Sequence, residues 1–60
     1  MTPYDIARVR DAARELASLE EQGMKYGDAE MKVIIKYDIP DEFIPRLQEC
    51  YATEFAIDDG

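Results

Sequence analysis

The sequence predicts a small α+β fold in the order helix, strand, helix, because three segments differ in hydrophobic periodicity. Apolar residues recur at helical spacing over residues 3–22, alternate with mostly charged residues over residues 30–39, and return to steps of three and four over residues 45–55. We take residues 1–60 as a single small domain and expect residues 56–60 to form a frayed acidic tail.

The first predicted helix has both end signals and an apolar face. Thr2 can cap the helix, Pro3 suits its first position, and Asp5 stands three residues after the cap. Gly23 suits the left-handed residue that ends many helices. Three of the residues that share the apolar face are alanines, and the full set is Ile6, Val9, Ala12, Ala13, Leu16, Ala17 and Leu19.

The predicted strand has one entirely apolar side. That side consists of Met31, Val33, Ile35, Tyr37 and Ile39. A lone strand leaves its backbone donors and acceptors without partners. Three partners are open: residues 53–57 of the tail, a second copy in a homodimer, or the sheet edge of another protein. We expect Val33, Ile35 and Tyr37 to mediate this pairing.

The second predicted helix follows a short turn. Pro40 ends the strand, residues 40–44 form the turn, and Pro45 suits the first position of the helix. The apolar face of this helix contains Ile44, Leu47, Tyr51 and Phe55.

Composition favours binding over catalysis. The chain has no His and a single cysteine, Cys50, which lacks a neighbouring base. Adjacent carboxylates on a helix point apart, and so short a chain has little room for a pocket of roughly 300 Å³ or more. We therefore expect no catalytic site, metal or cofactor.

The net charge of −7 predicts repulsion from nucleic acids and anionic membranes. We see no signal peptide and no apolar run long enough to span a bilayer. The expected location is the cytoplasm, or the host-cell cytoplasm if the gene belongs to a phage.

Negative charge is concentrated towards the C-terminus. From residue 38 onwards there are seven acidic residues and one basic residue, Arg46, which leaves a net charge of −6. We expect a basic protein surface as the partner. The predicted anionic contacts are Asp38, Asp41, Glu42, Glu49 and Glu54. Tyr4 and Tyr26 are the predicted exposed anchors.

Glu20 interrupts the apolar face of the first helix, so it either reaches water, pairs with Lys25 or Arg46, or meets the partner.

The leading functional hypothesis is a small acidic inhibitor or modulator that occupies the basic surface of a nucleic-acid-binding protein. Its charge density allows only partial mimicry of nucleic acid. In size and charge the chain resembles the small acidic proteins that phages direct against host defence or transcription, anti-CRISPR proteins included.

An alternative comes from residues 32–43. The stretch Lys-Val-Ile-Ile-Lys-Tyr-Asp-Ile-Pro-Asp-Glu-Phe resembles the strand and helix start of ribbon–helix–helix repressors and antitoxins. The resemblance implies a regulatory homodimer paired through the strand, with Lys32, Ile34 and Lys36 on the base-reading face. The net charge argues against DNA binding itself. A small subunit or adaptor of a larger complex is a third possibility.

Overall fold

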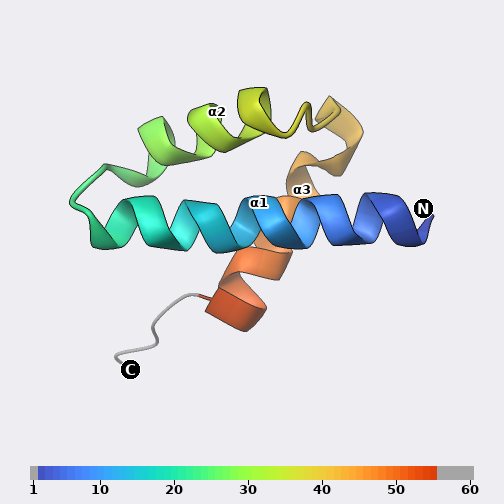
Figure 1. Cartoon of the computed structure of the whole chain (residues 1–60), viewed down its shortest axis with the longest axis horizontal. Helices are drawn as coiled ribbons and strands as arrows, with labels where there is room; N and C mark the ends of the chain where they lie inside the picture. The colour runs from blue at the N-terminus through green and yellow to red at the C-terminus, as the bar shows by residue number, and fades with distance from the viewer. Residues whose placement is uncertain (1, 56–60) are drawn as a thin grey trace.

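The computed structural model describes residues 2–55, and every regular element in this part of the chain is helical. Helix α1 lies along the longest axis of the molecule, α2 runs back beside it, and α3 crosses its middle (Figure 1). The 3₁₀ turn η1 precedes α3, and the π-helical turn η2 continues it. The bounds are Pro3–Glu21 for α1, Tyr26–Lys36 for α2, Asp41–Phe43 for η1, Ile44–Cys50 for α3 and Tyr51–Phe55 for η2.

The α+β prediction is wrong, because residues 2–55 contain no strand and the segment expected to form one is mostly α2. The hydrogen bonds of a helix satisfy backbone groups that a lone strand would leave unpaired. In the helix, the apolar residues that would share one side of a strand point in different directions. Val33 is buried, whereas Met31 and Ile35 are 64% and 73% exposed. Val33, Ile35 and Tyr37 therefore share no pairing surface.

Helix α1 begins with the capping box that the sequence predicts. The Thr2 hydroxyl accepts a hydrogen bond from the Asp5 N–H at 3.2 Å, and the Asp5 carboxylate accepts one from the Thr2 N–H at 3.3 Å. Gly23, two residues beyond the end of the helix, takes the left-handed position with a φ of 101°, which suits glycine. The Met24 N–H then donates to the Leu19 carbonyl at 3.1 Å, which completes a Schellman motif.

Helix α2 ends with a second Schellman motif, in which Asp38 takes the left-handed position. Its φ is 53°, and it is the one residue other than glycine with positive φ in the described part of the chain. The Ile39 N–H donates to the Ile34 carbonyl at 2.9 Å, and the Asp38 N–H donates to the Ile35 carbonyl at 3.3 Å. This turn redirects the chain from α2 towards η1.

The core lies where α1, α2 and α3 meet. Its largest fully buried side chains are Leu16, Val33 and Leu47, one from each helix. Three buried alanines allow the helix backbones to approach closely. The complete set of buried apolar residues is Val9, Ala12, Ala13, Leu16, Leu19, Ala29, Val33, Ile39 and Leu47.

The C-terminal segment is helical as far as Phe55, where the sequence predicts a helix over residues 45–55. Its last five described residues form the π-helical turn. The prediction that residues 53–57 pair with a strand is wrong for residues 53–55, because these residues belong to η2. The frayed tail expected at residues 56–60 lies outside the described residues. No helix within residues 2–55 has an apolar stretch long enough to cross a bilayer.

Candidate interaction surfaces

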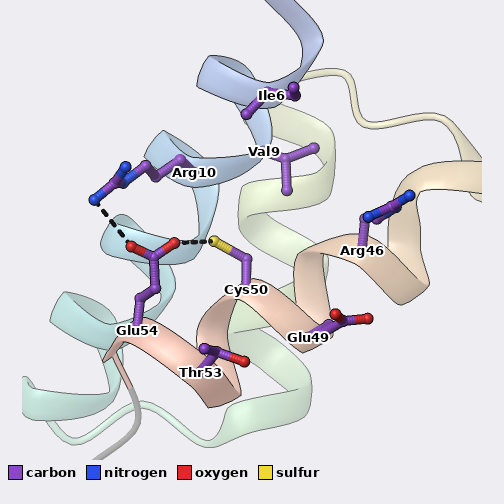
Figure 2. Close-up of a pocket in the computed structure, with 8 residues that line it drawn as sticks. All are labelled: Ile6, Val9, Arg10, Arg46, Glu49, Cys50, Thr53 and Glu54. Carbon is purple, nitrogen blue, oxygen red and sulfur yellow. Dashed lines mark hydrogen bonds and ion pairs between the residues drawn. The ribbon is translucent and has the colours of Figure 1, made fainter. Parts of the chain in front are cut away.

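A groove separates the N-terminal half of α1 from α3 and η2 (Figure 2). Its volume is about 360 Å³, which falls in the range of small-ligand pockets. The expectation that so short a chain has little room for such a hollow is therefore wrong. The residues that line it are Ile6, Val9, Arg10, Arg46, Glu49, Cys50, Thr53 and Glu54.

One end of the groove is held by an ion pair between α1 and η2. Arg10 contacts Glu54 at 2.9 Å, and the same carboxylate accepts a hydrogen bond from the Cys50 thiol at 3.4 Å (Figure 2). Burial raises the pKa of the Cys50 thiol, and Glu54 raises it further through this hydrogen bond and its charge. The positive charge of Arg10 acts in the opposite direction. Cys50 is therefore a weak nucleophile at neutral pH.

The other end of the groove is open and carries both signs of charge. Arg46 and Glu49 lie three residues apart on α3, and both are exposed. Neither forms an ion pair within the described residues. Ile6, from α1, lies at the mouth of the groove and is 54% exposed. The open end thus combines an exposed apolar side chain with one free cation and one free anion.

The five predicted anionic contacts are exposed and divide between two places. Glu49 and Glu54 line the groove, where Glu54 is engaged by Arg10. Asp38, Asp41 and Glu42 lie in the connection between α2 and α3. We call these three residues the acidic turn. No ion pair joins any of them to a cation in residues 2–55.

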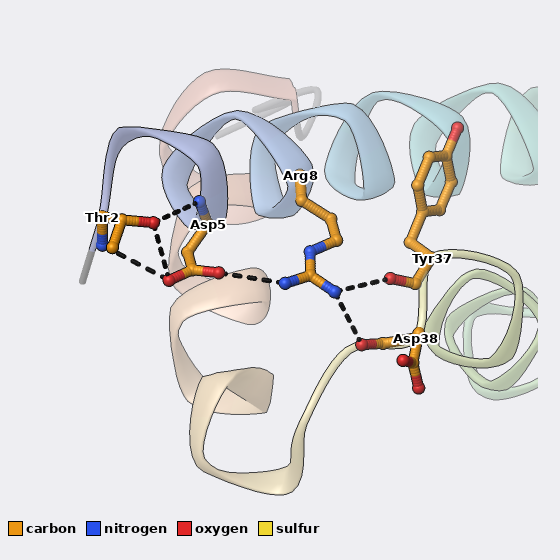
Figure 3. A network of polar contacts seen from close by, with 5 residues as sticks. All are labelled: Thr2, Asp5, Arg8, Tyr37 and Asp38. Carbon is orange, nitrogen blue, oxygen red and sulfur yellow. Dashed lines mark hydrogen bonds and ion pairs between the residues drawn. The ribbon is translucent and has the colours of Figure 1, made fainter.

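A polar network holds the start of the acidic turn against α1 (Figure 3). The Arg8 guanidinium donates to the main-chain carbonyls of Asp38 at 3.2 Å and Tyr37 at 3.5 Å, and it pairs with Asp5 at 2.9 Å. The hydrogen bonds from Thr2 and Arg8 lower the pKa of Asp5. Arg8 therefore connects the first turn of α1 to the two residues that follow α2.

Only one of the two predicted tyrosine anchors is largely free. Tyr4 is 73% exposed, and its ring lies 5.2 Å from the Arg8 guanidinium. Tyr26 begins α2 instead of lying in a loop, and its ring centroid is 5.4 Å from that of Tyr51. Burial and a hydrogen bond to Glu30 raise the pKa of Tyr26 to about 12. Tyr4 is thus the better candidate for an exposed anchor.

Glu20 has a partner that the sequence reasoning did not consider. It is half-buried and accepts a hydrogen bond from the Tyr51 hydroxyl, instead of pairing with Lys25 or Arg46. This contact joins the C-terminal half of α1 to η2. Glu20 therefore has a structural role inside the chain.

Lys36 of α2 also has an internal role. Lys36 pairs with Glu15 of α1 at 2.8 Å, and the Tyr37 hydroxyl donates to the same carboxylate at 3.0 Å. The base-reading face implied by the ribbon–helix–helix resemblance needs Lys32, Ile34 and Lys36 on one side of a strand. On a helix, Ile34 is turned away from the two lysines. The resemblance therefore does not describe the fold of this segment.

Sequence reasoning missed the groove and the roles of Ile6, Arg10 and Arg46 in it. The groove depends on the angle at which α3 crosses α1, and no local motif encodes that angle. A weak signal is Ile6, which stands at the edge of the apolar face of α1.

Comparison with known proteins adds no relative, since no family model, curated protein or solved structure matches the chain.

Proposed function

We propose that this chain is a small acidic protein-binding module that inhibits or modulates a nucleic-acid-binding protein by occupying a basic surface on it. The observation that supports this most is the acidic turn. Asp38, Asp41 and Glu42 are exposed within five positions of the chain, and the described residues provide them with no ion-pair partner. Such a group of carboxylates attracts a basic surface and accelerates its encounter.

Internal ion pairs leave the net charge unchanged, but they determine which cations are free to interact with the acidic turn. Three of the seven basic side chains, those of Arg8, Arg10 and Lys36, pair with carboxylates of their own chain. They are therefore less available to offset the acidic turn. Three exposed carboxylates match only a few phosphates of a nucleic acid, so the mimicry is partial.

The test is competition with nucleic acid. A fluorescent duplex is bound to each member of a panel of basic nucleic-acid-binding proteins, RNA-guided nucleases included, and this chain is added. We expect displacement of the duplex from at least one member, and weaker displacement as salt rises. If no member releases its duplex, the proposal is contradicted.

A matched pair of variants assigns the effect to the acidic turn. The triple variant D38N/D41N/E42Q removes three exposed carboxylates from the turn. The control D11N/E21Q/D28N removes three exposed carboxylates from α1 and α2. An exposed ion pair contributes about 0.5 kcal/mol, so the turn variant should compete roughly tenfold less well than the control. Equal competition by the two variants would count against the turn as the contact.

A further inference from the structure

The open end of the groove has the properties of a self-complementary surface. Two copies related by a two-fold axis present the same patch to each other, so each charge in the patch must find its opposite there. Arg46 and Glu49 satisfy this condition, because they are adjacent exposed charges of opposite sign on one helix. When two such helices pack antiparallel, Arg46 of each copy faces Glu49 of the other.

The charge balance of the groove makes it a better place for two copies to meet than the acidic turn. The groove contains two arginines and two glutamates, Arg10 and Arg46 against Glu49 and Glu54, whereas the whole chain carries −7. An approach through the acidic turn would instead bring three exposed carboxylates of each copy together. The groove is thus a place where two copies can meet without that repulsion.

The groove also presents apolar surface for a second copy to cover. Ile6 is 54% exposed at its mouth, beside buried Val9 and half-buried Cys50. From charge complementarity and this apolar surface together, we propose that the groove binds a second copy of the chain, with reciprocal Arg46–Glu49 ion pairs. The patch is small, so the dimer belongs to the weak, concentration-dependent class.

This proposal is independent of the proposed function, because it uses different residues. Acidic-turn variant D38N/D41N/E42Q should dimerise as the unmodified chain does. If the chain fails to displace a duplex, the dimer proposal is unaffected. If the chain is a monomer, the proposed role of the acidic turn is unaffected.

The experiment is charge swapping followed by sedimentation from about 10 μM to about 1 mM, the range of weak association. R46E and E49R should each be monomeric, because like charges then meet across the axis. An equimolar mixture of the two variants should recover the dimer, because one chain offers two acids and the other offers two bases. The double variant R46E/E49R should dimerise with itself for the same reason.

Matched controls change the same charge elsewhere. R14E and E21R alter exposed residues of α1 that do not line the groove, and both should keep the dimer. Cys50 gives a second readout, because a copy seated in the groove covers this sole thiol. Its alkylation should slow as concentration rises in the unmodified chain and in the mixture, but not in R46E or E49R alone.

Three outcomes would overturn the proposal. The first is a monomer across the whole range. The second is a dimer that R46E and R14E weaken equally. The third is a mixture of R46E and E49R that stays monomeric while circular dichroism shows both chains folded.

Discussion

The guanidinium of Arg8 donates a hydrogen bond to the main-chain carbonyl of Asp38 at 3.2 Å, across 30 positions of the chain. The last carbonyls of a helix lack intrahelical donors and carry partial negative charge. Arg8 supplies both a donor and a positive charge at the end of α2. A side chain of α1 therefore helps to determine where α2 stops and where the acidic turn begins.

Replacing Arg8 by Ala should lower the free energy of unfolding by about 1–2 kcal/mol, because charge-assisted hydrogen bonds and the helix-dipole interaction are both lost. Urea denaturation monitored by circular dichroism measures this change. The control is R14A, which removes an exposed arginine without an ion pair among the described residues and should change stability by less than about 0.5 kcal/mol. Equal effects of the two variants would contradict the role of Arg8.

The left-handed position at the end of α2 predicts that D38G stabilises the chain. Asp38 has a φ of 53°, which strains an L-residue, and its carboxylate lies at the negative end of the helix. We expect a gain of about 0.5–1 kcal/mol in unfolding free energy. The converse change G23A, at a φ of 101°, should cost about 1 kcal/mol or more. A loss of stability in D38G would show that its side chain stabilises the turn.

Substitutions of Val33 and Ile35 test whether this segment is a helix or a strand with one buried side. Val33 is fully buried and Ile35 is 73% exposed. V33A should therefore cost about 2 kcal/mol, because it removes two buried methyl groups and leaves a cavity. I35A should change stability by less than about 0.5 kcal/mol, since Ala is also a better helix former. Similar losses for V33A and I35A in urea denaturation would favour the strand.

The ion pair of Glu15 with Lys36 predicts how stability depends on pH. The hydrogen bond from Lys36 lowers the pKa of Glu15 below 4.5, helped by Tyr37, although burial opposes it. The same hydrogen bond raises the pKa of Lys36 above 10.5. The stabilisation from Glu15 is thus complete above pH 4.5 and is lost as pH falls through its lowered pKa. The stabilisation from Lys36 is complete below pH 10.5 and is lost as pH rises through its raised pKa.

Urea midpoints measured from about pH 6 to about pH 3 test the acid side of this profile. E15Q should flatten the fall in stability relative to the unmodified chain. E21Q is the control, because Glu21 is exposed and makes no side-chain contact with a cation in the described part of the chain. A profile for E15Q as steep as that for E21Q would contradict the assigned role of Glu15.

The thiol of Cys50 should react slowly with iodoacetamide near neutral pH, because burial and Glu54 raise its pKa. E54Q removes a charge and weakens the hydrogen bond to the thiol, so the rate should increase. The rate in urea gives the reference for an unprotected cysteine. Dilute protein is used, so that association does not affect the rate. An unchanged rate in E54Q would assign the slow reaction to burial alone.

Helix α1 could be predicted because its signals are local. Thr2, Pro3 and Asp5 define its start, Gly23 defines its end, and the apolar residues between them recur at a single period. Each of these features acts within a few residues, so no knowledge of the remaining chain is needed.

Helix α2 could not be predicted in the same way, because its apolar residues fit two periods. Val33, Ile34 and Ile35 are β-branched and favour a strand intrinsically. Their cost in a helix is only about 0.5 kcal/mol each, which is less than that of an unpaired strand backbone. Asp38, followed by apolar Ile39 and Pro40, was the local signal of a helix end. Pro40 alone is equally compatible with the end of a strand, which is where the predicted strand stops.

The exposure of the predicted anionic contacts followed from their charge, but their spatial grouping did not. Charge alone favours solvent for Asp41 and Glu49. Their separation into the acidic turn and the groove depends on how α3 packs on α1. The ion pair of Arg10 with Glu54 joins residues 44 positions apart, and sequence periodicity contains no such information.

The strand-like composition of α2 has a consequence for the unfolded chain. Residues 31–37 combine β-branched and aromatic side chains in a short window without glycine or proline. Such windows form cross-β aggregates when their backbone is released from native structure. Lys32 and Lys36 interrupt the window with like charges, and Pro40 blocks its extension, in the manner of gatekeeper residues. Arg8 and Lys36 connect the end of α2 to α1, so their contacts also help to hold this window in the native helix and away from amyloid-type self-assembly.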